Sequence, residues 1–356
     1  MRIAVLATSR NPLRQPWLGG QESHTGLLAQ ALRARGHHVT LHARPGSDPA
    51  LADEIVPYPD LPPLSVAAAA DPDVPPPAMM RDHAAFTSAM SLLLRDGGVD
   101  LVHNQSLHHL PLAMSAVLDL PLVTTLHTPP LPMMEMGVAL ADPRNRYVGV
   151  SQTTARAWTT LPQPATVIRN GVPTGGGPPG PGGDHLLWVG RITAEKGVDI
   201  AIAVARAMGC RLRIAGPVYD PEYFESVIAP VLGPDVELLG HLSSEELVHE
   251  RDHSAVSLVT SRWEEPFGLV AAESMVRGTP VVALDRGGLR EVVGPRGGVL
   301  VPGQEDDGLV CRVVEGVRAA LRLDRQDVAD WARSTHDIEL MVDRYEQLFE
   351  DVVRSR

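Results

Sequence analysis

Short runs of consecutive apolar residues alternate with helix-like patterns along the whole chain of 356 residues. Continuous apolar runs are typical of strands buried on both faces, and apolar spacings of three and four are typical of helices that cover a sheet. The repeated alternation predicts an α/β protein with parallel, doubly wound sheets. One hydrophobic core seldom serves a chain of this length, so two such domains are expected.

The pattern places each predicted element by residue number. In the first half, strands are predicted at Ile3–Ala7, Val39–His42, Leu101–His103, Leu122–Leu126, Tyr147–Val150 and Thr166–Ile168, with a helix at Gln21–Arg35. In the second half, strands are predicted at Leu186–Val189, Leu212–Ala215, Val236–Leu238, Ala255–Val259, Val281–Ala283 and Val299–Val301. Helices between them are predicted at Val198–Met208, Glu222–Leu232, Ser244–Arg251 and Leu269–Arg277, and a last helix at Ile338–Val353.

Two segments rich in proline or glycine interrupt this pattern. The stretch from Pro57 to Pro77 cannot form a regular helix or a central strand, so we expect an irregular surface excursion there. Residues 173–183 are mostly Gly and Pro and are predicted to link a domain at 1–172 to a domain at 184–336. Two doubly wound domains that face each other would bind ligands in the cleft at the carboxyl ends of their strands.

Charge and cysteine content narrow the class of partner. The formal net charge of -12 argues against nucleic acid or an anionic membrane as the main partner. No apolar run reaches the roughly 18 residues of a membrane span, so stable membrane insertion is not expected. Cys210 and Cys311 lie far apart and form no disulfide framework, which favours a reduced, cytoplasmic protein.

Lys196 is the only lysine of a chain that contains 31 lysines and arginines. It lies with Arg191 in the segment Gly190–Gly197, directly after an apolar run. A strand end followed by glycine, two cations and a helix start is a suitable place for a phosphate group. The alternative is a chance surface lysine at the start of a helix.

Glu265 and Glu273 form the strongest local signal. Pro266 and Gly268 precede an apolar run with helical spacing, so a helix should begin near Gly268. The two carboxylates would then lie about 12 Å apart along the helix axis. They cannot share one bond-breaking site, but they could hold two ends of an elongated ligand through its hydroxyl groups. Alternatively, Glu265 caps the helix and Glu273 lies on its solvated face.

With Pro266–Leu269 between them, Glu265 and Glu273 resemble the E-x7-E element of retaining glycosyltransferases of the glycogen-synthase-like family four. Other stretches follow in the order of that family: Gly19-Gly20, His127, Val150-Ser151, Arg169–Val172, Arg191 with Lys196-Gly197, Gly278–Ala283 and Gly287–Val293. The resemblance covers nearly the whole chain. It implies the GT-B fold, in which two Rossmann-like domains face each other across a cleft and the last helix, residues 337–356, crosses back to the first domain.

The resemblance also implies how a nucleotide-sugar donor would bind. Arg191 and Lys196 would hold its diphosphate, and Glu273 would take the ribose hydroxyls. Glu265 would take hydroxyls of the donor sugar, helped by the backbone amides of Phe267, Gly268 and Leu269.

Three residues of the first domain complete the implied donor site. At Gly19 and Gly20, the lack of a side chain would let backbone N–H groups approach the diphosphate, although two glycines also suit an ordinary turn. In the family, a histidine at the position of His127 bonds the donor sugar near the reacting carbon. The alternative is a structural histidine at the end of a strand.

The acceptor pocket is predicted in the first domain, near Gly20–His24, His103–His109 and Pro129–Met136. His24 and His103 are candidate contacts, and no acid or cysteine cluster makes the histidines metal ligands. Glu22 and Glu135 would suit a cationic acceptor.

These residues together predict a retaining, metal-independent transfer of a hexosyl group from a nucleoside-diphosphate sugar to a small soluble acceptor, without a cofactor. The charge that develops on the leaving diphosphate would be stabilised by Arg191 and Lys196. A nucleotide-sugar epimerase of the same fold and a non-catalytic sugar-nucleotide sensor remain alternatives. A dinucleotide-dependent oxidoreductase is disfavoured, because no G-x-G-x-x-G follows the first strand.

Overall fold

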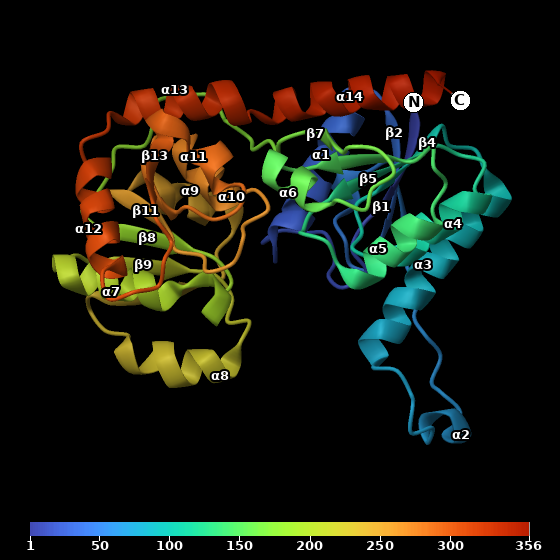
Figure 1. Cartoon of the computed structure of the whole chain (residues 1–356), viewed down its shortest axis with the longest axis horizontal. Coiled ribbons are helices and arrows are strands. Elements are labelled where there is room, and N and C mark those ends of the chain that lie inside the picture. The colour runs from blue at the N-terminus through green and yellow to red at the C-terminus, as the bar shows by residue number, and fades with distance from the viewer. Residues whose placement is uncertain (356) are drawn as a thin grey trace.

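The chain forms two parallel β-sheets, each covered by helices on both faces, in a computed structural model that describes residues 1–355 (Figure 1). The N-terminal domain contains β1 (Arg2–Leu6), α1 (Gly20–Ala34), β2 (His38–Ala43), β3 (Glu54–Pro57), α2 (Val66–Ala69), α3 (Pro77–Asp96), β4 (Leu101–Asn104), α4 (His109–Met114), β5 (Leu122–Leu126), α5 (Pro132–Leu140), β6 (Arg146–Gly149), α6 (Gln152–Ala157) and β7 (Thr166–Val167). The C-terminal domain contains β8 (Leu186–Val189), α7 (Val198–Met208), β9 (Leu212–Ala215), α8 (Pro221–Tyr223), β10 (Val236–Gly240), α9 (Ser244–Asp252), β11 (Val256–Val259), α10 (Leu269–Met275), β12 (Val281–Leu284), α11 (Leu289–Gly297), β13 (Gly298–Val301), α12 (Leu309–Ala320) and α13 (Arg325–His336). The last helix is α14 (Ile338–Arg354).

The two sheets share one winding order. The N-terminal sheet runs β3-β2-β1-β4-β5-β6-β7 and the C-terminal sheet runs β10-β9-β8-β11-β12-β13, with all the paired strands parallel. Each sheet therefore starts at its centre, grows to one edge and then resumes beside the first strand. This order leaves a crevice where the winding direction reverses, at the carboxyl ends of the central strands. The predicted class of two Rossmann-like domains is confirmed.

Burial on both faces explains why the strands are continuous apolar runs. In β1, Ile3 and Val5 pack on the face covered by α1, while Ala4 and Leu6 pack on the opposite face. All four side chains are at most 2% exposed. Because adjacent residues of a strand point to opposite faces, a strand between two helical layers needs apolar residues at every position.

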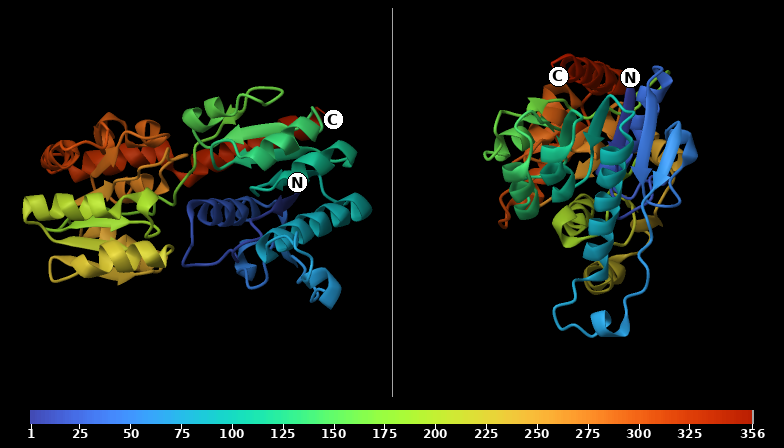
Figure 2. Two further views of the ribbon diagram at one scale, coloured as in Figure 1. Left: turned by 60° about the horizontal axis from the view of Figure 1, so that its bottom comes forward. Right: turned by 90° about the vertical axis from the view of Figure 1, so that its right-hand side faces the viewer.

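The C-terminal helix belongs to the core of the N-terminal domain. Met341, Val342, Tyr345 and Phe349 of α14 are buried in the same cluster as Ile3 and the apolar face of α1. Both views of Figure 2 show α14 running back along the N-terminal domain, with the two chain ends close to that domain. The crossing of the last helix that the resemblance implied is present in the fold.

Several segments differ from the predicted pattern. The predicted helix at Glu222–Leu232 is broken into the short α8, a π-helical turn at Phe224–Ile228 and a 3-10 turn at Ala229–Val231. Pro230 explains the break, because it lacks the N–H that a continuing α-helix needs. The excursion after Pro57 is largely irregular, but it carries the four-residue helix α2 and leads into α3, which the sequence pattern did not reveal (Figure 1).

The Gly/Pro-rich segment between the sheets lies along the C-terminal domain. The N–H groups of Gly180 and Gly182 donate to the carbonyls of Arg277 and Asp252, both at 2.8 Å. A Cβ at Gly183 would come within 1.8 Å of the His253 carbonyl oxygen. These glycines permit a close backbone approach, so part of the linker is fixed to one domain. No helix among residues 1–355 is long and apolar enough to cross a bilayer.

Candidate active site

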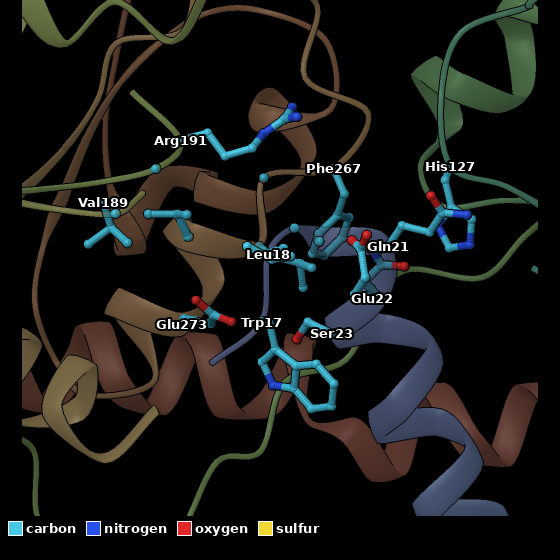
Figure 3. Close-up of a pocket in the computed structure, with 18 of the residues that line it drawn as sticks. Trp17, Leu18, Gln21, Glu22, Ser23, His127, Val189, Arg191, Phe267 and Glu273 are labelled. Atoms are coloured by element: carbon cyan, nitrogen blue, oxygen red, sulfur yellow. The ribbon is translucent and has the colours of Figure 1, made fainter. Parts of the chain in front are cut away.

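A cavity of about 610 Å³ lies between the two domains. Its walls come from loops at the carboxyl ends of β1, β5, β8 and β11 and from the first turns of α1 and α10. Figure 3 shows Arg191, Val189 and Glu273 on one side of this cleft and His127, Glu22 and Ser23 on the other. The fold therefore brings the predicted donor residues of the second domain opposite those of the first.

Lys196 and Glu265 meet in the cleft. Lys196 Nζ lies 2.5 Å from Glu265 Oε1, and the Ser261 hydroxyl donates to the same oxygen at 2.5 Å. The two charged side chains are only 17% and 11% exposed. Lys196 Nζ also lies 4.7 Å from the centre of the Trp263 ring, a cation–π arrangement. An ammonium group has three donors, so Lys196 can hold Glu265 and still bind an anion.

Backbone geometry after β8 places Lys196 there. Gly197, with a φ of 67°, turns the chain into α7, and a Cβ at this position would lie 2.1 Å from the Thr260 carbonyl oxygen. The Thr260 hydroxyl donates to the Gly197 carbonyl at 2.7 Å and accepts from the Trp188 indole at 3.1 Å. This close contact between the β8 and β11 loops requires glycine and fixes the lysine at the cleft wall.

Arg191 occupies the neighbouring position on the cleft wall. Its guanidinium lies 4.7 Å from the centre of the Tyr219 ring and 3.5 Å from a carboxylate oxygen of Glu195. The side chain is 32% exposed, so it is held by its neighbours but remains accessible to a ligand.

Glu273 has a partner that the sequence did not suggest. Arg251, at the end of α9, forms a short ion pair with Glu273, and its side chain is only 6% exposed. Its Nε is buried without a hydrogen-bond partner among residues 1–355. Glu273 is therefore neither free nor a solvated face residue, and both members of the pair line the cleft.

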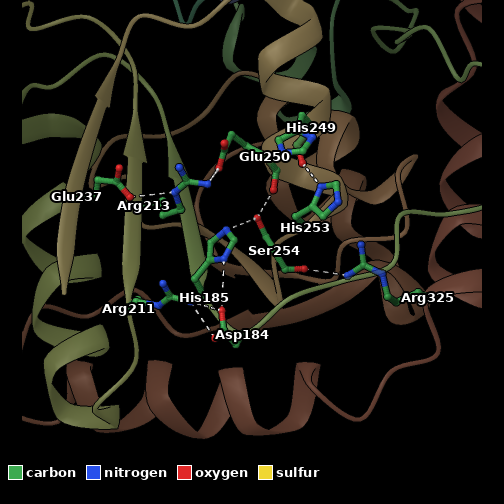
Figure 4. A network of polar contacts seen from close by, with 10 residues as sticks. All are labelled: Asp184, His185, Arg211, Arg213, Glu237, His249, Glu250, His253, Ser254 and Arg325. Atoms are coloured by element: carbon green, nitrogen blue, oxygen red, sulfur yellow. Dashed lines mark hydrogen bonds and ion pairs between the residues drawn. The ribbon is translucent and has the colours of Figure 1, made fainter. Parts of the chain in front are cut away.

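A polar network holds α9, the helix that carries Arg251, against the sheet (Figure 4). Glu250 accepts a hydrogen bond from Arg213 at 2.6 Å, and Arg213 also bonds Glu237 at 3.2 Å. These contacts hold the last turn of α9 against the sheet, on the side away from the cleft. Within α9, Glu250 therefore holds the helix against the sheet, whereas the adjacent Arg251 reaches the cleft.

The segment Gly287-Gly288 supports the loop of Glu265. The Gly288 N–H donates to the Glu265 carbonyl at 2.6 Å, and a Cβ at Gly287 would lie 2.2 Å from that oxygen. Gly268, with a φ of 106°, starts α10 directly beyond this contact, as the sequence predicted. Phe267 is 2% exposed and packs into the core, so only its backbone can serve a ligand.

The first turn of α1 faces α10 across the cleft. A Cβ at Gly20 would lie 3.1 Å from Leu269 Cδ1, and one at Gly19 would lie 2.8 Å from Glu22 Oε2. The φ of Gly19 is -166°, which any residue can adopt. At Gly20 the space is limited by Leu269 of the other domain, whereas at Gly19 an added Cβ would meet only the movable end of Glu22 in the same helix.

His127 lines the cleft at the end of β5 and is 8% exposed. Its Nε2 lies 2.5 Å from Gln105 Oε1, and its ring meets that of His24 edge-on at 5.0 Å. Burial holds the pKa of His127 well below its usual value, and the neighbouring His24 and His103 add to this effect. The imidazole is therefore neutral at physiological pH.

Three of the four predicted acceptor contacts need correction. His24 and His103 are 1% and 0% exposed and do not line the cleft, because the core packing between α1, β4 and α14 encloses them. Glu135 lies on α5 outside the cleft, where it accepts a hydrogen bond from Thr160 at 3.0 Å. Glu22 does line the cleft, and it accepts from Asn11 at 2.9 Å.

The N-terminal wall of the cleft has polar groups that the sequence did not reveal. Asp82 and Phe86 of α3 line the cleft with Ser9 and Arg10. The Ser9 hydroxyl donates to Asp82 at 2.5 Å, and Arg10 lies 3.6 Å from the same carboxylate. Asp82 and Phe86 were not candidates, because the hydrophobic pattern of the sequence did not predict α3.

A direct contact between the domains frames the cleft. The Glu291 carboxylate of α11 accepts hydrogen bonds from the N–H groups of Gln152 and Thr153 at 2.9 and 2.8 Å. These are the first two residues of α6 in the other domain. An acid at a helix N-terminus is favourable, so Glu291 fastens the two domains together.

Comparison with known proteins agrees with this architecture. Residues 18–175 match the model of Glycosyltransferase Family 4, and residues 181–323 match that of Glycosyl transferases group 1. Glycogen synthase of Mycobacterium tuberculosis (strain ATCC 25618 / H37Rv) is 28% identical over 368 residues, which cover 90% of this chain and 85% of that protein. Together, the two models span both domains.

Solved structures resemble the whole chain. The sucrose-phosphate synthase of Thermosynechococcus elongatus has a TM-score of 0.78 and 20% identity, covering 100% of both chains. HepE of Anabaena, solved in complex with UDP and glucose, has a TM-score of 0.76 and 19% identity, covering 98% of this chain and 99% of that one.

Proposed function

Since this chain belongs to the glycosyltransferases of family 4 and group 1, with the two-domain GT-B fold, we propose that it moves a hexosyl group from a nucleoside-diphosphate sugar to an acceptor hydroxyl, with retention of configuration. The observation that carries this proposal is the pairing of Lys196 with Glu265 at 2.5 Å in the cleft wall opposite His127. HepE, of similar fold, binds UDP and glucose, which is in keeping with such a donor.

The C-terminal wall suits the donor diphosphate. Arg191 and Lys196 supply positive charge, and the first amides of α10 are free of helical partners. Preorganised donors of this kind stabilise charge that develops on a leaving group, and removing one typically costs about 100- to 1,000-fold in rate. We assign Glu265 to the sugar hydroxyls and Glu273 to the ribose, as the resemblance implied.

The proposed chemical step is front-face substitution. The bond between the anomeric carbon and the diphosphate oxygen breaks, and a bond from the acceptor oxygen forms on the same face of the ring. The acceptor proton passes to an oxygen of the departing diphosphate, so protons and charge balance. Lys196 and Arg191 neutralise the leaving group, and the reaction as proposed requires no metal ion or cofactor.

We propose a small, soluble, hydroxyl-rich acceptor that binds on the N-terminal wall. Glu22, Asp82 and Ser9 offer oxygen acceptors there, and Arg10 offers a donor. A cytoplasmic location suits Cys210 and Cys311, which are both free thiols.

A donor screen followed by product analysis tests the proposal. UDP-, GDP-, ADP- and dTDP-sugars are added separately, and the one that binds is expected to raise the melting temperature by mass action. NMR of the product formed with a sugar acceptor should then show the same anomeric configuration as the donor. Epimerised donor without acceptor would indicate an epimerase, and binding without turnover of any acceptor would indicate a sensor.

A further inference from the structure

A continuous chain of buried hydrogen bonds runs from the cleft to the C-terminal helix. His127 Nε2 lies 2.5 Å from Gln105 Oε1, and Gln105 Nε2 lies 2.9 Å from His103 Nε2. His103 Nε2 also lies 3.0 Å from the Thr125 hydroxyl, which in turn lies 3.0 Å from the Tyr345 hydroxyl of α14. His103, Gln105 and Thr125 are each 0% exposed, so water cannot replace any of these contacts.

The amide of Gln105 determines the hydrogen positions in this chain. Its oxygen only accepts hydrogen bonds and its nitrogen only donates them. In the orientation that the structure gives this amide, Nε2 of His127 carries a hydrogen, and Nε2 of His103 is unprotonated and accepts. Thr125 can then donate to His103, and Tyr345 to Thr125. The single lone pair of His103 Nε2 is then shared between Gln105 and Thr125, and both imidazoles are neutral.

This arrangement fixes which nitrogen of His127 is available to a ligand. With Nε2 committed to Gln105, the free lone pair is on Nδ1, which has no hydrogen-bond partner among residues 1–355. Because His127 lines the cleft, that nitrogen can accept a hydrogen bond from a hydroxyl of a bound sugar.

We propose that Gln105 is a positioning residue, which holds His127 in the neutral Nε2–H tautomer so that Nδ1 can accept a hydrogen bond from the donor sugar. The role toward the sugar rests on the proposed glycosyltransferase function. The tautomer itself does not, so it can be tested separately.

The backbone of Gln105 is also fixed. Gln21, in the first turn of α1, donates from its side chain to the Gln105 carbonyl at 2.5 Å. Residues of α1, β4, β5 and α14 thus act together on one imidazole. This gives the crossing helix α14 a function at the cleft in addition to covering the sheet.

NMR of ¹⁵N-histidine-labelled protein tests the tautomer without any substrate. The His127 signals are assigned as those lost in His127→Gln. At pH 7, Nε2 should have the chemical shift of a protonated pyrrole-type nitrogen and Nδ1 that of a pyridine-type nitrogen. In Gln105→Leu, this preference should be lost or reversed. The proposal is overturned if the wild-type protein shows the Nδ1–H tautomer, or if Gln105→Leu leaves both shifts unchanged.

Steady-state kinetics test the consequence for catalysis. Gln105→Leu is expected to lower kcat by about 10- to 100-fold while the affinity for free nucleoside diphosphate stays within twofold. Gln105→His should recover most of the activity, because an imidazole also has one donor and one acceptor nitrogen. Gln326→Leu on the exposed face of α13 is the matched control. Wild-type kcat in Gln105→Leu, or equal losses in the Leu and His variants, would contradict a positioning role.

Gln105→Glu adds a pH readout. A carboxylate at this position faces His127, His103 and, beyond them, His24 and Tyr345. It should raise the pKa of His127, so that kcat falls on the acid side where the wild-type profile is flat. The ¹⁵N titration identifies which histidine is responsible, and a flat profile for the variant would count against the proposal. If no donor is turned over by the wild-type protein, the proposed function fails while the tautomer test still stands.

Discussion

The two domains have the same winding order but opposite chemistry at the cleft. The C-terminal wall presents Lys196, Arg191 and Arg251, and two of these cations are paired with Glu265 and Glu273. The N-terminal wall presents a neutral histidine held by an amide, together with hydroxyl and carboxylate oxygens. A shared scaffold thus supports one wall rich in cations and another of mixed polar groups, because the chemistry depends on the side chains at the strand ends rather than on the fold.

The largest effect should come from removing the charge of the C-terminal wall. Lys196→Ala should lower kcat by about 100- to 1,000-fold, since the proposed mechanism then loses one preorganised donor to the leaving group. Lys196→Arg should retain more activity because it keeps the charge. Steady-state rates with saturating donor measure the effect, and circular dichroism checks the fold. Near-wild-type turnover in the alanine variant would show that this wall does not stabilise the leaving group.

The pair Arg251–Glu273 should affect donor binding more than turnover. Arg251→Met or Glu273→Met should raise KM for the donor roughly 10- to 100-fold, the worth of a hydrogen bond to a charged group. Each single variant leaves one charge of the pair without its partner, so the double variant should be more stable than either. Titration with nucleoside diphosphate measures the effect on donor binding, and thermal melts measure the effect on stability. Arg318→Met on the surface is the control. If the stability losses of the two single variants simply add in the double variant, Arg251 and Glu273 are not energetically coupled.

Acid should destabilise the N-terminal domain first. Burial lowers the pKa of His24 and His42 to about 4 and that of His103 to about 3. The unfolded chain takes up protons near the usual value of 6.5 whereas the folded domain does not, so stability is lost as the pH falls below 6.5. Each of these histidines should lower the free energy of unfolding by roughly 1–2 kcal/mol at pH 5, at about 1.4 kcal/mol per pH unit.

Calorimetry between pH 7.5 and 5.0 measures this loss. His42 lies outside the cleft, so His42→Gln should reduce the pH dependence without changing donor binding. A melting temperature that is constant over this range would mean that these histidines are protonated in the folded state.

The contact between the domains should give the smallest effect. Glu291→Gln keeps the shape of the side chain but removes the charge at the start of α6. Such charges at helix ends contribute about 0.3–1 kcal/mol, so donor KM should rise only about two- to fivefold. Small-angle scattering should show a slightly larger radius of gyration. An unchanged radius and KM would show that the two walls are held together by other contacts.

The sequence predicted the C-terminal wall of the cleft better than the N-terminal wall. The residues predicted to bind a donor lie in short segments where Gly, Pro and charge have a fixed order, such as Gly190–Gly197 and Glu264–Glu273, and the structure brings both segments to the cleft. The acceptor candidates were chosen from residue type alone. Whether His103 or Glu135 faces a cavity depends on helices that pack over them, and neither does.

By itself, the sequence determined the two doubly wound sheets and the spacing of Glu265 and Glu273, because these follow from local periodicity and turn chemistry. Only the tertiary structure decided the partners of the site residues. Arg251 reaches Glu273 across 22 residues, and Tyr345 reaches Thr125 across 220. Such pairs form where strands become neighbours and helices dock, and that depends on burial of apolar surface across the whole domain.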